Sequence, residues 1–136
     1  MTAAELDNAL VGAWDAVLTF TGGPRKDEHE QVCLTFLPDG LIVGTDAANG
    51  QLPPAIGEWT AESDRFSYWL NAVLNEPGGR PTVIVYGHGE GTLAADGQAF
   101  TVSGGSEVYG GNGELLATNL ADACATRLAA GARLGV

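Results

Sequence analysis

Turn-forming residues interrupt this sequence at fairly even intervals, and they constrain the fold more than any other feature. Glycine, proline, asparagine and aspartate favour reverse turns through positive φ, a preset φ, or side-chain bonds to the nearby backbone. Seven such clusters occur, at Thr21-Gly22-Gly23-Pro24, Pro38-Asp39-Gly40, Asn49-Gly50 to Pro53-Pro54, Ser63-Asp64, Pro77-Gly78-Gly79, Asp96-Gly97 and Asn112-Gly113. Seven connections predict eight short segments with no room for crossover helices, which is typical of an antiparallel meander.

The segments between the turns are rich in Val, Ile, Thr, Phe, Tyr and Trp, the residues that favour strands. We expect strands near residues 12–21, 29–37, 41–46, 55–62, 65–74, 82–94, 99–109 and 114–119 or beyond. In the first two, apolar residues recur at every second position, which marks the inward faces. Leu18, Phe20, Leu34 and Phe36 lie on these faces, and we expect them to line the interior.

The two ends of the chain carry other signals. Thr2-x-x-Glu5 matches a capping box, and Leu6 and Leu10 share one helical face, so we expect a short helix that plugs one end of the fold. The alanine-rich segment 120–130 favours helix by propensity, whereas a meander needs its eighth strand to close. Two alternatives stay open here: a strand to about Leu128, or a short strand followed by a terminal helix.

Composition excludes several functional classes. With 17 acidic and 6 basic residues the formal net charge is -11, which repels phosphate backbones and anionic membranes, so we expect neither nucleic acid nor membrane as a partner. No apolar run approaches the roughly 20 residues that span a bilayer, and the first residues lack the features of a secretory signal. We expect one domain over residues 1–136, in the cytoplasm, with Cys33 and Cys124 as reduced thiols.

An eight-stranded meander exposes two sheet edges unless it closes on itself. Closing eight strands leaves an interior that side chains fill or that admits one small ligand. The fold class we expect is therefore all-β: an eight-stranded antiparallel up-and-down β-barrel with a short N-terminal helix. An apolar small molecule in the barrel is the expected partner.

The stretch Leu10-Val11-Gly12-Ala13-Trp14 resembles the Gly-x-Trp signature that opens the first strand in the calycin superfamily, the lipocalins and fatty-acid-binding proteins. Arg127 is in the place where such proteins pack an arginine on that tryptophan. The resemblance implies that Trp14 and Arg127 close one end of the barrel. Without a lipocalin cysteine pair or a helix-turn-helix lid, the chain is most similar to minimal bacterial calycin-like barrels, a group that includes cofactor-independent cyclases of polyketide pathways.

The segment Tyr86-Gly87-His88-Gly89-Glu90-Gly91 carries the most unusual pattern, because alternation puts three polar residues on one face and three glycines on the other. If the polar face points inward, Tyr86, His88 and Glu90 line an apolar cavity, where desolvation suits them to proton transfer. If the glycine face points inward, the missing side chains leave room for a ligand. Both readings remain open.

Aromatic residues concentrate in the middle of the chain. Trp59 and Trp69 are candidates for a stacking wall, and Tyr68 is a candidate polar group beside it. Tyr68 and Trp69 are adjacent in one expected strand, so their side chains cannot both face inward.

Other chemistry is not supported. His88 and Glu90 lie about 7 Å apart along one strand and His29 is the only further imidazole, so we expect no metal. No serine occupies a Gly-x-Ser-x-Gly elbow and no helix follows the glycine-rich stretches, so we expect neither covalent catalysis nor a cofactor. The run Asp27-Glu28-His29-Glu30 is interpreted as a solvated loop and strand edge.

These observations lead to three functional hypotheses. The first, carried by the resemblance, is a cofactor-independent cyclase or isomerase of natural-product biosynthesis, in which Tyr68, Tyr86, His88 and Glu90 polarise or anchor a carbonyl. The second is a non-catalytic carrier or scavenger of an apolar metabolite. The third is a solidly packed barrel whose outer face, with Val17, Val43 or Trp69, serves association, as in a homodimer.

Overall fold

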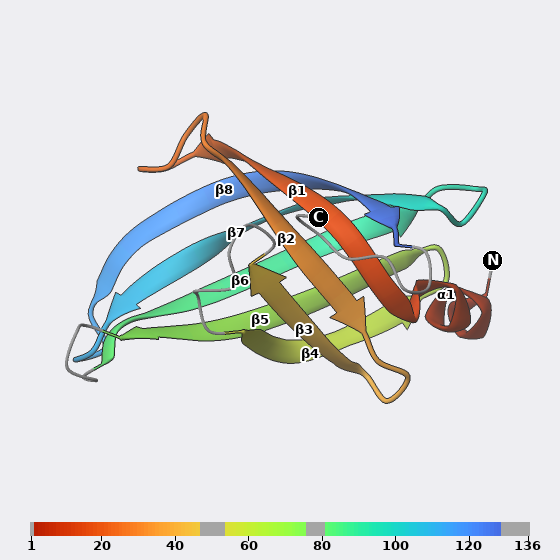
Figure 1. Cartoon of the computed structure of the whole chain (residues 1–136), viewed down its shortest axis with the longest axis horizontal. Helices are drawn as coiled ribbons and strands as arrows, with labels where there is room; N and C mark the ends of the chain where they lie inside the picture. The colour runs from red at the N-terminus through yellow and green to blue at the C-terminus, as the bar shows by residue number, and fades with distance from the viewer. Residues whose placement is uncertain (1, 47–53, 76–80, 129–136) are drawn as a thin grey trace.

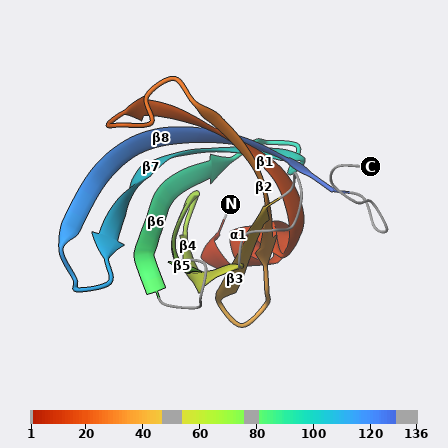
Figure 2. The same cartoon turned by 60° about the vertical axis from the view of Figure 1, so that its left-hand side comes forward.

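The computed structural model describes residues 2–46, 54–75 and 81–128. Its strands form one closed barrel in which each strand pairs antiparallel with the next and β8 returns to β1 (Figures 1 and 2). The elements are α1 (Ala3–Leu10), β1 (Gly12–Gly22), β2 (His29–Phe36), β3 (Leu41–Asp46), β4 (Ala55–Glu62), β5 (Arg65–Asn75), β6 (Pro81–Leu93), β7 (Ala99–Gly110) and β8 (Leu115–Arg127). The predicted all-β barrel with its short N-terminal helix is confirmed.

Strand β8 decides between the two alternatives for the C-terminal segment. It continues to Arg127 and pairs with both β7 and β1, so the strand alternative is correct over this range. Ala121, Ala123 and Ala125 are buried while their neighbours are exposed, a period of two that overrides the helix propensity of alanine. A helix after residue 128, and the expected turns at 49–53 and 77–79, lie outside the described residues.

Helix α1 lies at one end of the barrel, which we call the helix end (Figure 1). Its Leu6 and Leu10 side chains are fully buried in the barrel core, so the helix acts as the expected plug. The chain passes from α1 into β1 at Gly12, whose φ of 129° is a conformation that few other residues adopt. No helix among the described residues is long and apolar enough to cross a membrane.

The capping box at the start of α1 is formed as the sequence predicts. The Thr2 backbone N–H donates to the Glu5 carboxylate over 3.2 Å, and the Glu5 N–H donates to the Thr2 hydroxyl over 3.1 Å. The Thr2 backbone N–H, and then the Thr2 side chain, hold the pKa of the Glu5 carboxyl below its usual value, because both bond to its ionised form.

This depressed pKa predicts a pH dependence for the N-terminus of α1. The contribution of the ionised Glu5 to stability is present above its unfolded pKa and is lost as the pH falls through its lower folded pKa. An NMR titration should find that Glu5 titrates at a lower pH in the folded protein than in urea, and Thr2→Ala should narrow that gap. Equal pKa values in the folded and unfolded states would contradict the capping interaction.

Candidate functional site

The half of the barrel next to the helix end is packed solid with aromatic side chains. Phe36 lies 5.9 Å from Phe100 and 5.3 Å from Trp59 between ring centroids, and the ring planes are close to perpendicular. Phe66 joins the same cluster, 5.2 Å from Phe100. Phe36 and Trp59 were expected among the ligand-binding residues. They instead pack in the same core cluster as α1 and Trp14, and they do not line the cavity.

The other half of the barrel encloses a cavity of about 270 Å³. This volume lies just below the roughly 300–1,000 Å³ that is usual for small-molecule pockets. Its wall is mainly apolar and includes Leu18, Phe20, Val32, Leu34, Leu70, Val85, Val102, Ala121 and Ala123. Leu18, Phe20 and Leu34 thus lie where alternation placed them, and the cavity argues against a barrel that its own side chains fill.

Strand β6 presents its glycine face to the interior. Gly87 lines the cavity, and a Cβ on Gly89 or Gly91 would collide with Val102 and Phe66 of the interior. Tyr86, His88 and Glu90 alternate with these glycines and therefore have outward side chains. Of the two alternatives for this strand, the glycine face is therefore the inward one, and Tyr86, His88 and Glu90 do not form an interior polar wall, because Val102 and Phe66 leave no space for side chains at Gly89 and Gly91.

The outward residues form a surface cluster of their own. The His88 Nε2 atom lies 2.9 Å from a carboxylate oxygen of Glu107 on β7, and both side chains remain partly exposed. Trp69 stacks on Tyr86 at 6.2 Å between ring centroids. Trp69 therefore lies on the outer face and cannot line the cavity, because its neighbours Tyr68 and Leu70 on β5 take the inward positions.

Tyr68 is the predicted catalytic residue that does lie inside the barrel. Its ring faces Phe36 at 6.4 Å, and a Cβ on Gly89 would lie 3.0 Å from its hydroxyl oxygen. No hydrogen bond joins this hydroxyl to another described residue, although the Tyr68 side chain lines the cavity. Burial raises the pKa of Tyr68 to about 12, so the phenol stays protonated and can donate a hydrogen bond.

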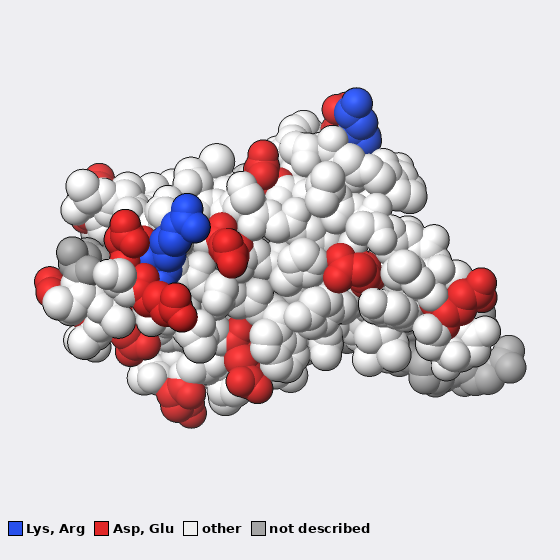
Figure 3. Space-filling model, turned by 180° about the vertical axis from the view of Figure 1, so that it is seen from behind, with Lys and Arg blue, Asp and Glu red and all other residues white. Residues whose placement is uncertain are grey.

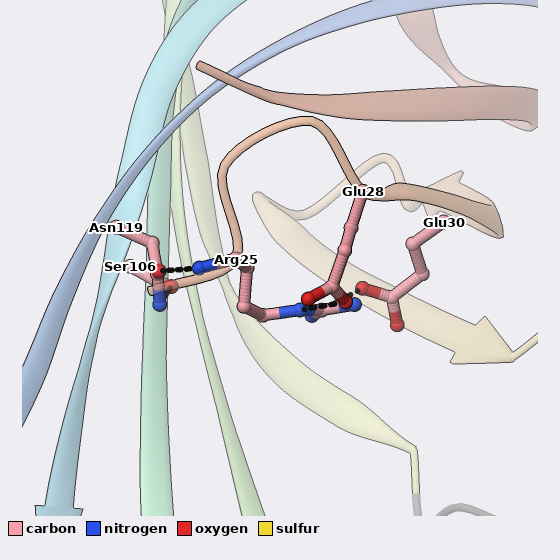
Figure 4. Close-up of polar contacts among 5 residues, drawn as sticks. All are labelled: Arg25, Glu28, Glu30, Ser106 and Asn119. Carbon is pink, nitrogen blue, oxygen red and sulfur yellow. Dashed lines mark hydrogen bonds and ion pairs between the residues drawn. The ribbon is translucent and has the colours of Figure 1, made fainter. Parts of the chain in front are cut away.

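A group of polar residues that sequence reasoning missed lies around the connection between β1 and β2 (Figure 4), and three of its members line the cavity. We call Arg25, Glu28, Glu30, Ser106 and Asn119 the far-end cluster. The Arg25 guanidinium lies 3.0 Å from a Glu28 carboxylate oxygen and 3.1 Å from a Glu30 carboxylate oxygen. The Arg25 guanidinium also stacks 4.1 Å above the Phe20 ring, which suits a cation at the edge of an apolar wall.

Asn119 ties this cluster to the barrel. Its side-chain oxygen accepts from the Arg25 backbone N–H over 3.3 Å, and its amide nitrogen donates to the Ser106 hydroxyl over 3.4 Å. Asn119 is the buried polar residue of the core region, at 3% exposed. These two bonds hold the connection between β1 and β2 against β8 and β7. Alternation with Val32 and Leu34 could have shown that Glu30 faces inward, contrary to its interpretation as solvated.

Trp14 and Arg127 meet at the helix end. The Arg127 guanidinium lies 4.2 Å above the Trp14 ring and donates to the backbone carbonyls of Val11, Gly97 and Ala9. The Trp14 indole N–H donates to the Leu10 carbonyl over 2.9 Å. This geometry is the one that the resemblance implied.

The described residues offer no metal centre: nowhere do three His, Cys, Asp or Glu side chains gather closely enough to hold an ion. Cys33 and Cys124 are free thiols. A mainly apolar cavity with one unpaired phenol and one paired arginine can bind and orient a small molecule.

Comparisons with known proteins add little about the site. No family model and no curated protein matches this chain. Among solved structures the chain is similar to the crystal structure of rhizavidin, with a TM-score of 0.47 and 8% sequence identity over 93% of this chain and 91% of that chain.

Proposed function

We propose that this protein binds a small, mostly apolar molecule inside the barrel and carries or sequesters it without converting it. The observation that carries this proposal is the cavity of about 270 Å³, walled by Leu, Val, Phe, Ala and Gly residues. Transfer of an apolar molecule from water into such a cavity is favourable, by about 25 cal/mol per Å² of apolar surface buried. The solid aromatic core on one side and the far-end cluster on the other limit the ligand to a small size.

A carrier is favoured over a cyclase or isomerase by where the polar residues lie. Tyr86, His88 and Glu90 were three of the four groups expected to act on a substrate, and they alternate with the inward glycines of β6. His88 borders the cavity, but its imidazole is paired with Glu107. One observation still supports the cyclase or isomerase as a second candidate: the Tyr68 hydroxyl is inside and could polarise a carbonyl. Under the carrier proposal the ligand is released unchanged, whereas a cyclase converts a linear precursor with turnover.

The carrier proposal is tested first by native mass spectrometry of the purified protein, which should retain one small molecule per chain. Ligand-detected NMR should then show saturable binding of coumarin and naphthalene, two small and mainly apolar ring probes that suit a small and mainly apolar cavity. If no molecule is retained and neither probe binds below millimolar concentration, the carrier proposal is wrong.

Gly87→Leu should abolish this binding by filling the cavity from its wall. A Cβ at Gly87 meets no atom within 4 Å, so the added side chain enters open space and not a neighbouring strand. We expect the Kd for coumarin to rise at least tenfold, while the thermal midpoint stays near that of the wild type. Glu90→Gln, on the same strand with its side chain outside, is the matched control and should bind like the wild type. Unchanged binding by Gly87→Leu would place the ligand elsewhere.

A further inference from the structure

We propose that the ligand of this cavity is a neutral, planar molecule with a hydrogen-bond acceptor such as a carbonyl oxygen, which receives the Tyr68 hydroxyl proton in a hydrogen bond. This inference rests on the proposed binding function and specifies the class of ligand. Three features of the cavity carry it: the unpaired phenol, the paired charges of the far-end cluster, and the glycine wall.

The Tyr68 hydroxyl supplies the directional contact. It lies beside Gly89 within an apolar enclosure, and no described residue forms a hydrogen bond with it. Among the described residues no fully buried polar atom lacks a partner, so this hydroxyl is within reach of water in the cavity, and a ligand acceptor would take the place of that water. A phenol is protonated at neutral pH, and burial raises the pKa of Tyr68 further, so its O–H can donate to an acceptor on the ligand.

The charges around the cavity select a neutral ligand over an anion. Among the described residues, Arg25 is the only lysine or arginine on the cavity wall, and it is already paired with Glu28 and Glu30. A carboxylate ligand would have to displace one of these pairs and would then lie against the other glutamate. On the face shown in Figure 3 acidic side chains are widespread and basic ones are few, and the net charge of -11 opposes the entry of anions.

The glycine wall selects a flat ligand. Gly87 on β6 and Gly104 on β7 line the cavity on neighbouring strands, whereas Val102 and Tyr68 cover Gly89 between them. No side chain rises from Gly87 or Gly104, so the peptide planes themselves form this part of the wall and a ring can approach them closely. Leu34 and Leu70 line other parts of the cavity and provide apolar contact. A planar ring with its acceptor toward Tyr68 fits this shape.

The test compares three ring probes of similar size: coumarin, which carries a carbonyl, naphthalene, which carries no acceptor, and 2-naphthoate, which is an anion. We expect wild-type protein to bind coumarin about three- to tenfold more tightly than naphthalene, the range that one net hydrogen bond provides. It should bind 2-naphthoate more weakly than either neutral probe. In Tyr68→Phe, which keeps the ring packing, coumarin should lose its advantage while naphthalene binds as before.

A second measurement reports on the hydrogen bond itself and not on affinity. The infrared carbonyl stretch of coumarin bound to the wild type should shift to lower wavenumber than in a hydrocarbon solvent, and the shift should vanish in Tyr68→Phe. Equal affinity for coumarin and naphthalene, preference for 2-naphthoate, or an unshifted carbonyl would overturn the ligand class while leaving the carrier proposal intact. Absence of binding by all three probes would instead refute both.

Discussion

The Trp14→Ala protein is expected to lose about 3–5 kcal/mol of its free energy of unfolding, as is typical when a large buried aromatic side chain is removed. Trp14 is fully buried at the helix end, where its ring lies 4.8 Å from that of Phe100 and beneath the Arg127 guanidinium. Its removal leaves a cavity and an arginine without its aromatic partner. Because a domain of this size has about 5–15 kcal/mol of net stability, urea unfolding should show a large shift in midpoint.

The same experiment separates the cation–π contact from simple burial. In a double-mutant cycle with Trp14→Ala and Arg127→Ala, the two losses should fall short of additivity by about 0.5–2 kcal/mol, the value of such a contact. Val17→Ala, on the same strand but 43% exposed, is the control and should change stability by less than about 1 kcal/mol. A loss at Trp14 no greater than that at Val17 would show that the pair does not hold the helix end together.

The barrel itself could be predicted because its signals are local. Each turn cluster and each run of alternating residues acts within a few positions of the chain, and antiparallel strands in sequence order need no further information to find their partners. The capping box of Thr2 and Glu5 is local in the same sense and formed as predicted. The bounds of β8 were less certain, because alanine fits both a helix and a crowded inward strand face.

The site could be predicted only in part, because which face of a strand points inward depends on the other strands. The β6 segment alternates polar residues with glycines, and either face satisfies the period of two. The decision comes from Phe66 and Val102, which occupy the interior next to Gly89 and Gly91 and leave no space for larger side chains. No local pattern in β6 reports that crowding.

The far-end cluster could not be predicted from local sequence patterns either, but the cause is different. Arg25 reaches Asn119 across 94 positions of sequence, and this contact holds part of an acidic turn at the cavity wall. A charged loop with Glu28 and Glu30 has the composition of an ordinary solvated connection. Its role depends on where β8 returns to β1, which is a property of the closed barrel and not of the segment.

Two glycines of the inner wall are expected to respond in opposite ways to the same substitution. Gly104→Ala should destabilise the protein by about 3 kcal/mol or more, because its Cβ would lie 2.0 Å from the His88 carbonyl oxygen and 2.7 Å from the Gly89 Cα. Both atoms belong to the backbone of β6, so no rotamer change relieves the collision. The paired strands β6 and β7 must separate locally, and amide hydrogen exchange should become faster along both.

Gly87→Ala is the matched control on the neighbouring strand. Its Cβ meets nothing within 4 Å, so the native state accepts it without strain, and the restricted unfolded chain favours folding by about 0.4–1 kcal/mol. Urea unfolding of the two variants should therefore give shifts of opposite sign. If both substitutions lower the free energy of unfolding alike, the space beside Gly87 is filled and the cavity is absent. If neither lowers it, β6 and β7 are not as close at Gly104 as this structure has them.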